Sequence, residues 1–257
     1  MRIAIFIYCL RGGGAQHRVL TLANGFAERG HMVDLVVVSA SESIGVALHS
    51  GVRVVSLEQN WHHAFEKLNH RINIRGLFTA SAIPMLARYL REEPPDVLLS
   101  GASHVNLVAI FARRFSKTNV PLVLRASNFP SGNIRWWPPL KQLIRRILRY
   151  TLGIVYPWAN HIIAVSRGVA CDVQRLTGLP SERVTIIYNP VVGPYIAHRA
   201  AEPVDHAWAT DVNVPLILAV GRLTIQKDYP TLIRAFAKIR AERAVHLVIL
   251  GEGRQRD

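Results

Sequence analysis

The chain has 257 residues, of which 50% are hydrophobic, enough to bury one substantial core or one core and part of a second. It carries 31 basic and 17 acidic side chains, so its net charge of +14 favours anionic partners such as nucleotide diphosphates, anionic lipid surfaces or nucleic acid. The two cysteines, Cys9 and Cys171, are too few and too isolated for a zinc site or a disulfide scaffold. We expect both to be reduced and buried, as in a cytosolic protein.

Arg2 is followed by a run of eight apolar residues, 3–10, which resembles the start of a signal peptide. A cleavage site needs small residues, whereas Arg11, a glycine triplet and the polar residues 16–18 come next. We therefore interpret the run as a buried strand that enters a loop. No run approaches the roughly 20 apolar residues that a membrane helix needs, so the sequence predicts a protein that does not span a bilayer.

Strand and helix patterns then alternate along the chain. Apolar residues recur at helical spacing after the glycine loop until Arg29 and Gly30, and a strand follows at 32–39. This is the size of a right-handed β-α-β crossover. A further helix is predicted at 77–91, and short apolar runs recur at 52–57, 96–100, 121–125, 161–166 and 185–188. The alternation predicts an α/β fold with a Rossmann-like, doubly wound parallel sheet.

Proline and glycine interrupt the segment 191–215, which we interpret as a linker between a first domain at 1–190 and a second that begins at 216. Beyond it the pattern predicts a strand at 216–220, a helix at 229–242 and a strand at 245–250. A lone β-α-β unit cannot cover its own sheet. Either these strands pack on the first domain, or the second domain, 216–257, is incomplete.

The strongest candidate site follows the strand at 216–220, where Gly221, Arg222 and Lys227 occupy the loop before the next helix. Open α/β sheets bind ligands at this carboxyl edge. Arginine can donate two parallel hydrogen bonds to phosphate oxygens and lysine adds a mobile charge, so the pair suits a diphosphate. The alternative is a solvated surface loop.

The segment 11–16, RGGGAQ, joins the first strand to the first helix. Its amides lie at a positive helix end, where a phosphate or sugar oxygen can dock. The adjacent glycines depart from the G-x-G-x-x-G fingerprint, and no acidic residue ends the second strand, where nicotinamide enzymes hold the ribose. A plain tight turn is the alternative.

Two polar clusters follow predicted strands, Ser103-His104 and the string 125–128, RASN. Both are expected at the ligand-facing edge of the sheet. A lone histidine is more often structural or exposed than catalytic, so both interpretations of His104 stay open. The other histidines, including His62, His63 and His70, lack metal-binding spacing with carboxylates, and we expect no bound metal.

Residues 136–158 begin with Trp136 and Trp137 and continue as a helix in which apolar residues alternate with cations, among them Arg145, Arg146 and Arg149. A basic amphipathic helix with aromatic anchors suits an anionic membrane interface. Alternatively, the apolar face packs on the sheet and the cations are only solvated. The two interpretations can coexist.

Six sequence segments occur in a specific order and spacing: GGGAQHRVLTLANGFAERGHMVDLVVV at 12–38, PDVLLS at 95–100, HIIAVSRGVACDV at 161–173, VTIIYNPV at 184–191, LAVGRLTIQKDYPTLIRAFAKI at 218–239 and LVILGEGRQR at 247–256. Together they resemble the retaining, nucleotide-sugar-dependent glycosyltransferases of family 4. Members of that family have two facing Rossmann-like domains, the B fold. The resemblance runs nearly from end to end.

The resemblance implies transfer of a sugar from a nucleotide-diphosphate sugar to a glycan or lipid-linked acceptor, with the anomeric configuration retained. By position, Arg222 and Lys227 would hold the diphosphate and neutralise its charge as it leaves, which makes a metal ion dispensable, and no other cofactor is implied. No protein nucleophile is established in such relatives, so electrostatic stabilisation of the leaving group would supply most of the catalysis.

The resemblance also assigns residues on both sides of the reaction, with His104 facing the sugar as a catalytic residue. The others are the donor-side Gly13, Gly14, Gly251 and Glu252, and the acceptor-side Arg125 and Asn128. Two departures matter. Ala126 stands where many relatives carry an acidic residue, and the family's pair of glutamates separated by seven residues lies downstream of the GEG loop, whereas this sequence ends at Asp257. If 257 residues are the whole product, we expect a truncated chain with impaired donor binding.

The leading hypothesis is therefore a glycosyltransferase of cell-surface polysaccharide or glycolipid assembly, cytoplasmic or peripheral on the inner face of a membrane. The second is a catalytically impaired protein that only binds the acceptor or the membrane. The third, a nucleic-acid binder, rests on charge alone, and no RNA- or DNA-binding module is visible, so we expect no nucleic-acid partner.

Overall fold

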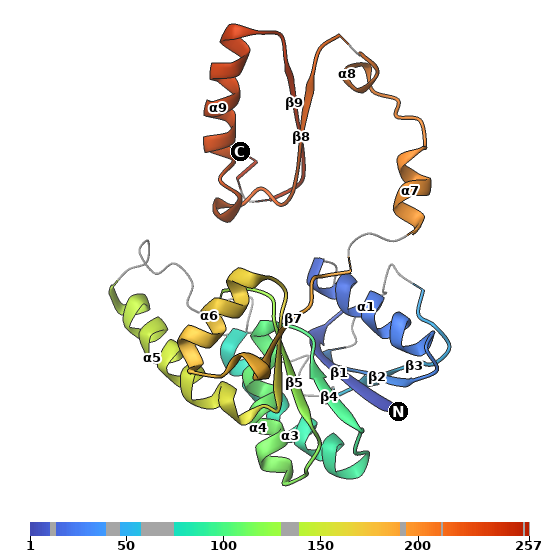
Figure 1. Cartoon of the computed structure of the whole chain (residues 1–257), viewed down its shortest axis with the longest axis vertical. Helices are drawn as coiled ribbons and strands as arrows, with labels where there is room; N and C mark the ends of the chain where they lie inside the picture. Colours follow the sequence, from blue (N-terminus) through green and yellow to red (C-terminus); the bar gives the residue numbers. More distant parts are fainter. Residues whose placement is uncertain are drawn as a thin grey trace. The chain divides into compact units, whose positions relative to one another are not determined.

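The computed structural model describes residues 1–10, 14–39, 47–57, 75–129, 139–190, 194–211, 213–253 and 255–256 (Figure 1). The chain divides into two compact units, Met1–Val191 and Val192–Asp257. Each unit is described by itself below.

The first unit is built on a seven-stranded sheet in which every neighbouring pair is parallel. Its strands are β1 (Arg2–Cys9), β2 (Met32–Ser39), β3 (Val52–Ser56), β4 (Val97–Ser100), β5 (Leu122–Ala126), β6 (His161–Ala164) and β7 (Val184–Ile186). Their order, β3-β2-β1-β4-β5-β6-β7, reverses direction between β1 and β4. The predicted α/β, doubly wound parallel sheet is confirmed, and the loops after β1 and β4 flank its topological switch point.

Helices cover both faces of this sheet (Figure 1). They are α1 (Gly14–Ala27), α3 (Arg75–Glu92), α4 (Asn106–Ser116), α5 (Pro139–Val155) and α6 (Arg167–Thr177). On β1, Ile5 packs in the same cluster as Leu20 of α1, whereas its neighbour Phe6 packs in the cluster that contains Leu86 of α3. Because successive side chains of a strand point to opposite faces, β1 is buried on both sides.

A network of charged side chains joins the beginnings of β1, β2 and β3 to the end of α3. Asp34 is 4% exposed and accepts hydrogen bonds from Arg2 Nε (2.8 Å), Arg53 Nε (2.8 Å) and the Tyr89 hydroxyl (2.6 Å). Burial alone would raise the pKa of Asp34, but hydrogen bonds from Arg53, Tyr89 and Arg2 outweigh it and lower that pKa. Glu93 accepts from the same two arginines.

The second unit contains β8 (Leu216–Val220), α9 (Tyr229–Glu242) and β9 (His246–Leu250), in which β8 and β9 pair in parallel. The segment expected to be a linker, 191–215, contains the short helices α7 (Pro194–Ala200) and α8 (Ala207–Thr210). Trp208 of α8 stacks on His246, with ring centroids 4.4 Å apart. Leu218, Val220 and Leu250 are exposed in the described part of the chain.

Both cysteines carry free thiols, but the expectation that both are buried is wrong for Cys171. Cys171 is exposed on α6, because Val169, Ala170 and Val173 form the side of that helix that packs inward. Cys9, at the end of β1, is half-buried.

Candidate functional site

The carboxyl ends of β1, β4 and β5 form one edge of the first sheet, and those predicted first-domain residues that the structure describes follow these strand ends. Gly14 begins α1 and is exposed, whereas Gly13 lies outside the described residues. His104 lies in the 3-10 helix η1 (Ser103–Val105) directly after β4, and its side chain is outside the described part of the structure. The edge is therefore assembled as predicted, while the role of His104 stays a prediction.

The loops after β4 and β5 are joined directly. The Ser127 backbone N–H donates to Ser103 Oγ at 2.9 Å, and the two hydroxyl oxygens are 3.2 Å apart. Asn128 is exposed just beyond this contact. The neighbouring Phe129 ring lies over the first turn of α6, where a Cβ added to Gly168 would be 3.1 Å from it. The 125–128 string thus presents Asn128 to solvent at this edge.

Arg125 differs from Asn128 because its side chain is only 4% exposed. Its guanidinium donates to the Gly101 carbonyl oxygen (3.0 Å) and to Asn189 Oδ1 (2.5 Å), which are both neutral acceptors. Burial, followed by the nearby charge of Arg18, lowers the pKa of Arg125 to about 10. The group still carries its charge at neutral pH, inside the protein.

The backbone of Arg125 is held by a buried amide that sequence reasoning missed. Asn106, at the start of α4, accepts from Ser100 Oγ (2.6 Å) and donates through Nδ2 to the Tyr156 hydroxyl (3.1 Å) and the Arg125 carbonyl oxygen (3.3 Å). Every polar atom of its side chain is therefore satisfied. An asparagine at the start of a largely apolar helix was the available signal, since a buried amide needs several partners.

In the second unit, the loop after β8 carries the two predicted cations, Arg222 and Lys227. The Tyr229 hydroxyl donates to the Gly221 carbonyl oxygen at 3.0 Å. The side chain of Lys227 folds back over Gly221, so that a Cβ there would be 3.2 Å from Lys227 Cε. Arg222 and Lys227 are both exposed, and Asp228 turns the chain into α9 with φ of 51°. The loop therefore presents two exposed cations, for which no ion pair is found among the described residues.

The GEG loop packs closely against this cationic loop. The Leu223 N–H donates to the Glu252 carbonyl oxygen at 2.9 Å, and a Cβ on Gly251 or Gly253 would overlap the backbone of residues 221–223. The Glu252 carboxylate pairs with Arg256 at 2.5 Å. Donor binding by Gly251 and Glu252 stays a prediction.

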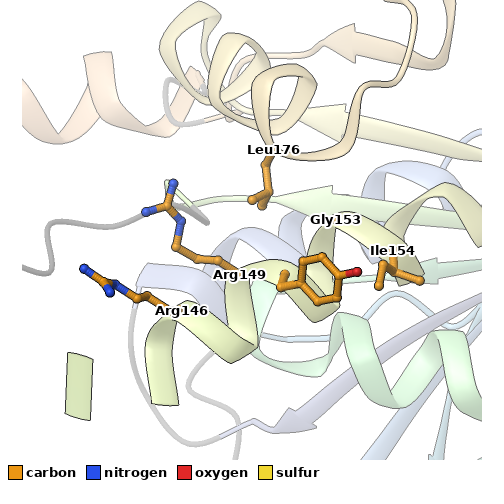
Figure 2. Close-up of a pocket in the computed structure, with 6 residues that line it drawn as sticks. Arg146, Arg149, Gly153, Ile154 and Leu176 are labelled. Carbon is orange, nitrogen blue, oxygen red and sulfur yellow. The ribbon is translucent and has the colours of Figure 1, made fainter. Parts of the chain in front are cut away.

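On α5, Arg146 is exposed and Arg149 is half-buried. Together with Tyr150, Gly153, Ile154 and Leu176, they line a hollow of about 410 Å³ between α5 and α6. Figure 2 shows the two guanidinium groups at one end of this hollow and Ile154 at the other. The other predicted membrane residues, Trp136 and Trp137 and the side chain of Arg145, lie outside the described residues.

Within the described residues, no group of three or more His, Cys, Asp or Glu side chains is placed to hold a metal ion. In that same part of the chain, no helix is long and apolar enough to cross a membrane.

Comparison with known proteins decides the family. A model described as Glycosyltransferase Family 4 matches residues 12–192. The chain belongs to glycosyltransferase family 4. This family 4 chain is 26% identical over its whole length to the N-acetylgalactosamine-N,N'-diacetylbacillosaminyl-diphospho-undecaprenol 4-alpha-N-acetylgalactosaminyltransferase of Campylobacter jejuni. A second Campylobacter jejuni enzyme, the GalNAc-alpha-(1->4)-GalNAc-alpha-(1->3)-diNAcBac-PP-undecaprenol alpha-1,4-N-acetyl-D-galactosaminyltransferase, is also 26% identical over the whole chain. The chain spans 64% and 63% of the length of these two relatives.

Solved structures of other glycosyltransferases share the fold of this family 4 chain. WaaG, a glycosyltransferase involved in lipopolysaccharide biosynthesis, matches 99% of the chain and 64% of its own length, with a TM-score of 0.60 and 16% identity. The lipopolysaccharide outer core galactosyltransferase WaaB matches 99% of the chain and 62% of its own, with a TM-score of 0.59 and 16% identity. At this level of identity the likeness concerns the fold.

Proposed function

We propose that the protein transfers a sugar from a nucleotide-diphosphate sugar to a glycan or lipid-linked acceptor, with retention of the anomeric configuration, in cell-surface polysaccharide or glycolipid biosynthesis. The observation that carries the proposal is the loop after β8, where Arg222 and Lys227 are exposed together beside Gly221. The relatives support the substrate class, because their names describe sugar transfer to diphospho-undecaprenol-linked saccharides.

The proposed catalysis depends on the negative charge that develops on the leaving diphosphate. Cleavage of the bond between sugar and phosphate leaves negative charge on the diphosphate. Arg222 can donate two parallel hydrogen bonds to phosphate oxygens, and Lys227 adds a point charge from the same loop. Cations that meet the charge as it develops stabilise the transition state more than the bound donor, and this difference is what accelerates the reaction. Charge neutralisation by side chains is the role that a metal ion would otherwise fill.

We assign the acceptor side of the reaction to the first unit. Gly14 and Asn128 are exposed at the edge where β1, β4 and β5 end, and η1 places His104 after β4. In this assignment His104 faces the transferred sugar, and Gly14, a donor-side residue exposed at the same edge, lets the donor approach.

The test is sugar transfer by the purified chain, measured as nucleoside-diphosphate release from a panel of nucleotide sugars with a polyprenyl-diphosphate-linked saccharide as acceptor. Arg222→Ala or Lys227→Ala should each lower the rate at least about 100-fold, the size of effect seen when one stabilising group of a transition state is removed. Arg240→Ala, which removes an equally exposed cation from α9, is the matched control and should leave the rate unchanged. Unchanged transfer by Arg222→Ala and Lys227→Ala would overturn the proposal.

We also propose a peripheral position at the inner face of a membrane. A strip of apolar side chains supports it, running from Phe115 through Trp158 to Ile154 and Tyr150, and Phe115 and Tyr150 are 61% and 74% exposed. Phe111 connects the strip, since its ring lies 6.3 Å from Phe115 and 6.1 Å from Trp158. Arginines border the strip: Arg113 donates to the Trp158 carbonyl oxygen (2.8 Å), and Arg146 and Arg149 line the hollow that contains Tyr150 and Ile154. Exposed apolar surface bordered by cations suits anionic headgroups.

A further inference from the structure

Two arginines of the first unit lie near each other without an acidic partner. Arg125, at the end of β5, is buried and donates only to Gly101 and Asn189. Arg18, on α1, is half-buried, and its Nε is buried without a hydrogen-bond partner. Among the described residues, no hydrogen bond or ion pair joins either guanidinium to a carboxylate. Gly101, whose carbonyl oxygen accepts from Arg125, lies against Val19, the residue after Arg18, since a Cβ added to Gly101 would be 2.9 Å from Val19 Cγ2. Burial and, after it, the charge of Arg18 lower the pKa of Arg125.

Asp34, another buried charged residue of the first unit, has oppositely charged partners. Asp34 is as deeply buried as Arg125, but it is neutralised by hydrogen bonds from Arg2 and Arg53. A buried charge is costly unless an opposite charge compensates it. The Arg18 and Arg125 pair adds mutual repulsion to that cost, so the structure maintains an arrangement that an anion would stabilise.

The surroundings add further positive potential. The guanidinium of Arg18 bends back over the first turn of α1, where a Cβ added to Gly14 would be 3.4 Å from its NH1 nitrogen. The amino end of this 14-residue helix carries partial positive charge. Since β1 and β5 both pair with β4, Arg18 and Arg125 belong to the edge that flanks the switch point of the sheet.

We propose that Arg18 and Arg125 bind a phosphate group of the acceptor, as a second phosphate site separate from the Arg222 and Lys227 loop of the second unit. Two guanidinium groups that lack a carboxylate have free donors for tetrahedral oxyanions, and Arg125, held by Gly101 and Asn189, supplies a preorganised one. The identity of the ligand as acceptor rests on the proposed function. The donor diphosphate carries the same chemistry, so the test compares both sources.

The experiment measures equilibrium binding to the full chain, without turnover, by isothermal titration calorimetry. Farnesyl diphosphate serves as a soluble polyprenyl diphosphate, UDP as a donor-type diphosphate, and farnesol as the tail without phosphate. Arg18→Gln should weaken farnesyl diphosphate binding at least about tenfold, and leave UDP and farnesol binding unchanged. Arg29→Gln is the matched control because Arg29 is exposed directly after the same helix, donates to Gly25 and carries the same charge.

Arg125→Lys is the second variant, which keeps the buried charge but removes the planar set of donors. With a circular dichroism spectrum like that of the unchanged chain, it should also bind farnesyl diphosphate more weakly. If Arg18→Gln weakens UDP binding instead, the phosphate site is supported and its ligand is the donor. If Arg18→Gln binds all three probes like the unchanged chain, or if Arg29→Gln has an equal effect, the proposal is overturned. Because no donor sugar is consumed, failure of the transfer assay leaves these results interpretable.

Discussion

The buried carboxylate of Asp34 gives a quantitative test of what stabilises the first unit. Asp34→Asn removes the one negative charge that meets Arg2, Arg53 and the Tyr89 hydroxyl together. Removing one partner of a buried ion pair typically costs about 3–5 kcal/mol. The side chains of Arg2 and Arg53 are 26% and 52% exposed, so water can solvate them again, and we expect the lower end, about 3 kcal/mol. For a unit of this size, that corresponds to a melting temperature lower by about 6–12 °C.

The stability difference between Asp34→Asn and the unchanged chain should also depend on pH in a definite direction. The pKa of Asp34 is lowered in the folded chain, so its contribution is present above the pKa of an unfolded aspartate, about 3.9. It is lost as the pH falls through the lower folded value. The difference in melting temperature between Asp34→Asn and the unchanged chain should therefore be full at pH 7 and shrink below about pH 4.

Thermal unfolding followed by circular dichroism at both pH values measures this difference. Glu28→Gln removes an exposed carboxylate from the same unit and should change stability by less than about 0.5 kcal/mol. The reasoning fails if Asp34→Asn melts like Glu28→Gln at pH 7, or if its defect is as large at pH 3 as at pH 7.

Three further outcomes are expected. Tyr156→Phe should cost about 1 kcal/mol of unfolding free energy in urea, because it removes one hydrogen-bond partner of a buried amide. Gly153→Ala should destabilise the fold by about 1–3 kcal/mol, because the new Cβ would lie 2.8 Å from a carbonyl oxygen of α6. Gly25→Ala, also inside a helix, would meet only the end of a flexible side chain and should stabilise the fold slightly. Equal effects of these two substitutions would contradict the close packing of α5 on α6. Ile154→Asp should weaken sedimentation with phosphatidylglycerol vesicles at least about tenfold, while Met32→Asp, an exposed apolar residue on β2, should not; equal losses would count against the apolar strip.

The elements of the fold follow closely from hydrophobic pattern. The strand at Met32–Ser39 has the predicted bounds, because a strand buried on both faces is mostly apolar, as in its run of buried residues 35–38. The pattern extended β7 to residue 188, but Ile187 and Tyr188 are exposed. Its partner β6 ends at Ala164, whose carbonyl oxygen accepts a last backbone hydrogen bond from the Ile187 N–H (2.9 Å), and the register of the two strands ends at Ile186.

The sequence predicted which edge of the sheet carries the candidate site, but not how the side chains at that edge are oriented. Parallel strands end at the same edge, so the clusters after β4 and β5 had to meet, and the contact between Ser103 and Ser127 shows that they do. The burial of Arg125 was not predictable, since it depends on Gly101 and Asn189. These two acceptors are 24 and 64 residues away along the chain. Local pattern identifies a charged residue at the end of a strand, but only the tertiary structure shows which way its side chain turns.

The close contact between the GEG loop and the cationic loop has an evolutionary consequence. Gly251 and Gly253 have no room for a side chain, because the backbone of residues 221–223 occupies that space. The two loops are therefore expected to evolve together. A change in the length of one loop requires a compensating change in the backbone of the other. Glycine is required at these positions by the packing of two backbone segments and not by substrate binding. We therefore expect both glycines to be retained in descendants that no longer bind the substrate and have lost Arg222 or Lys227.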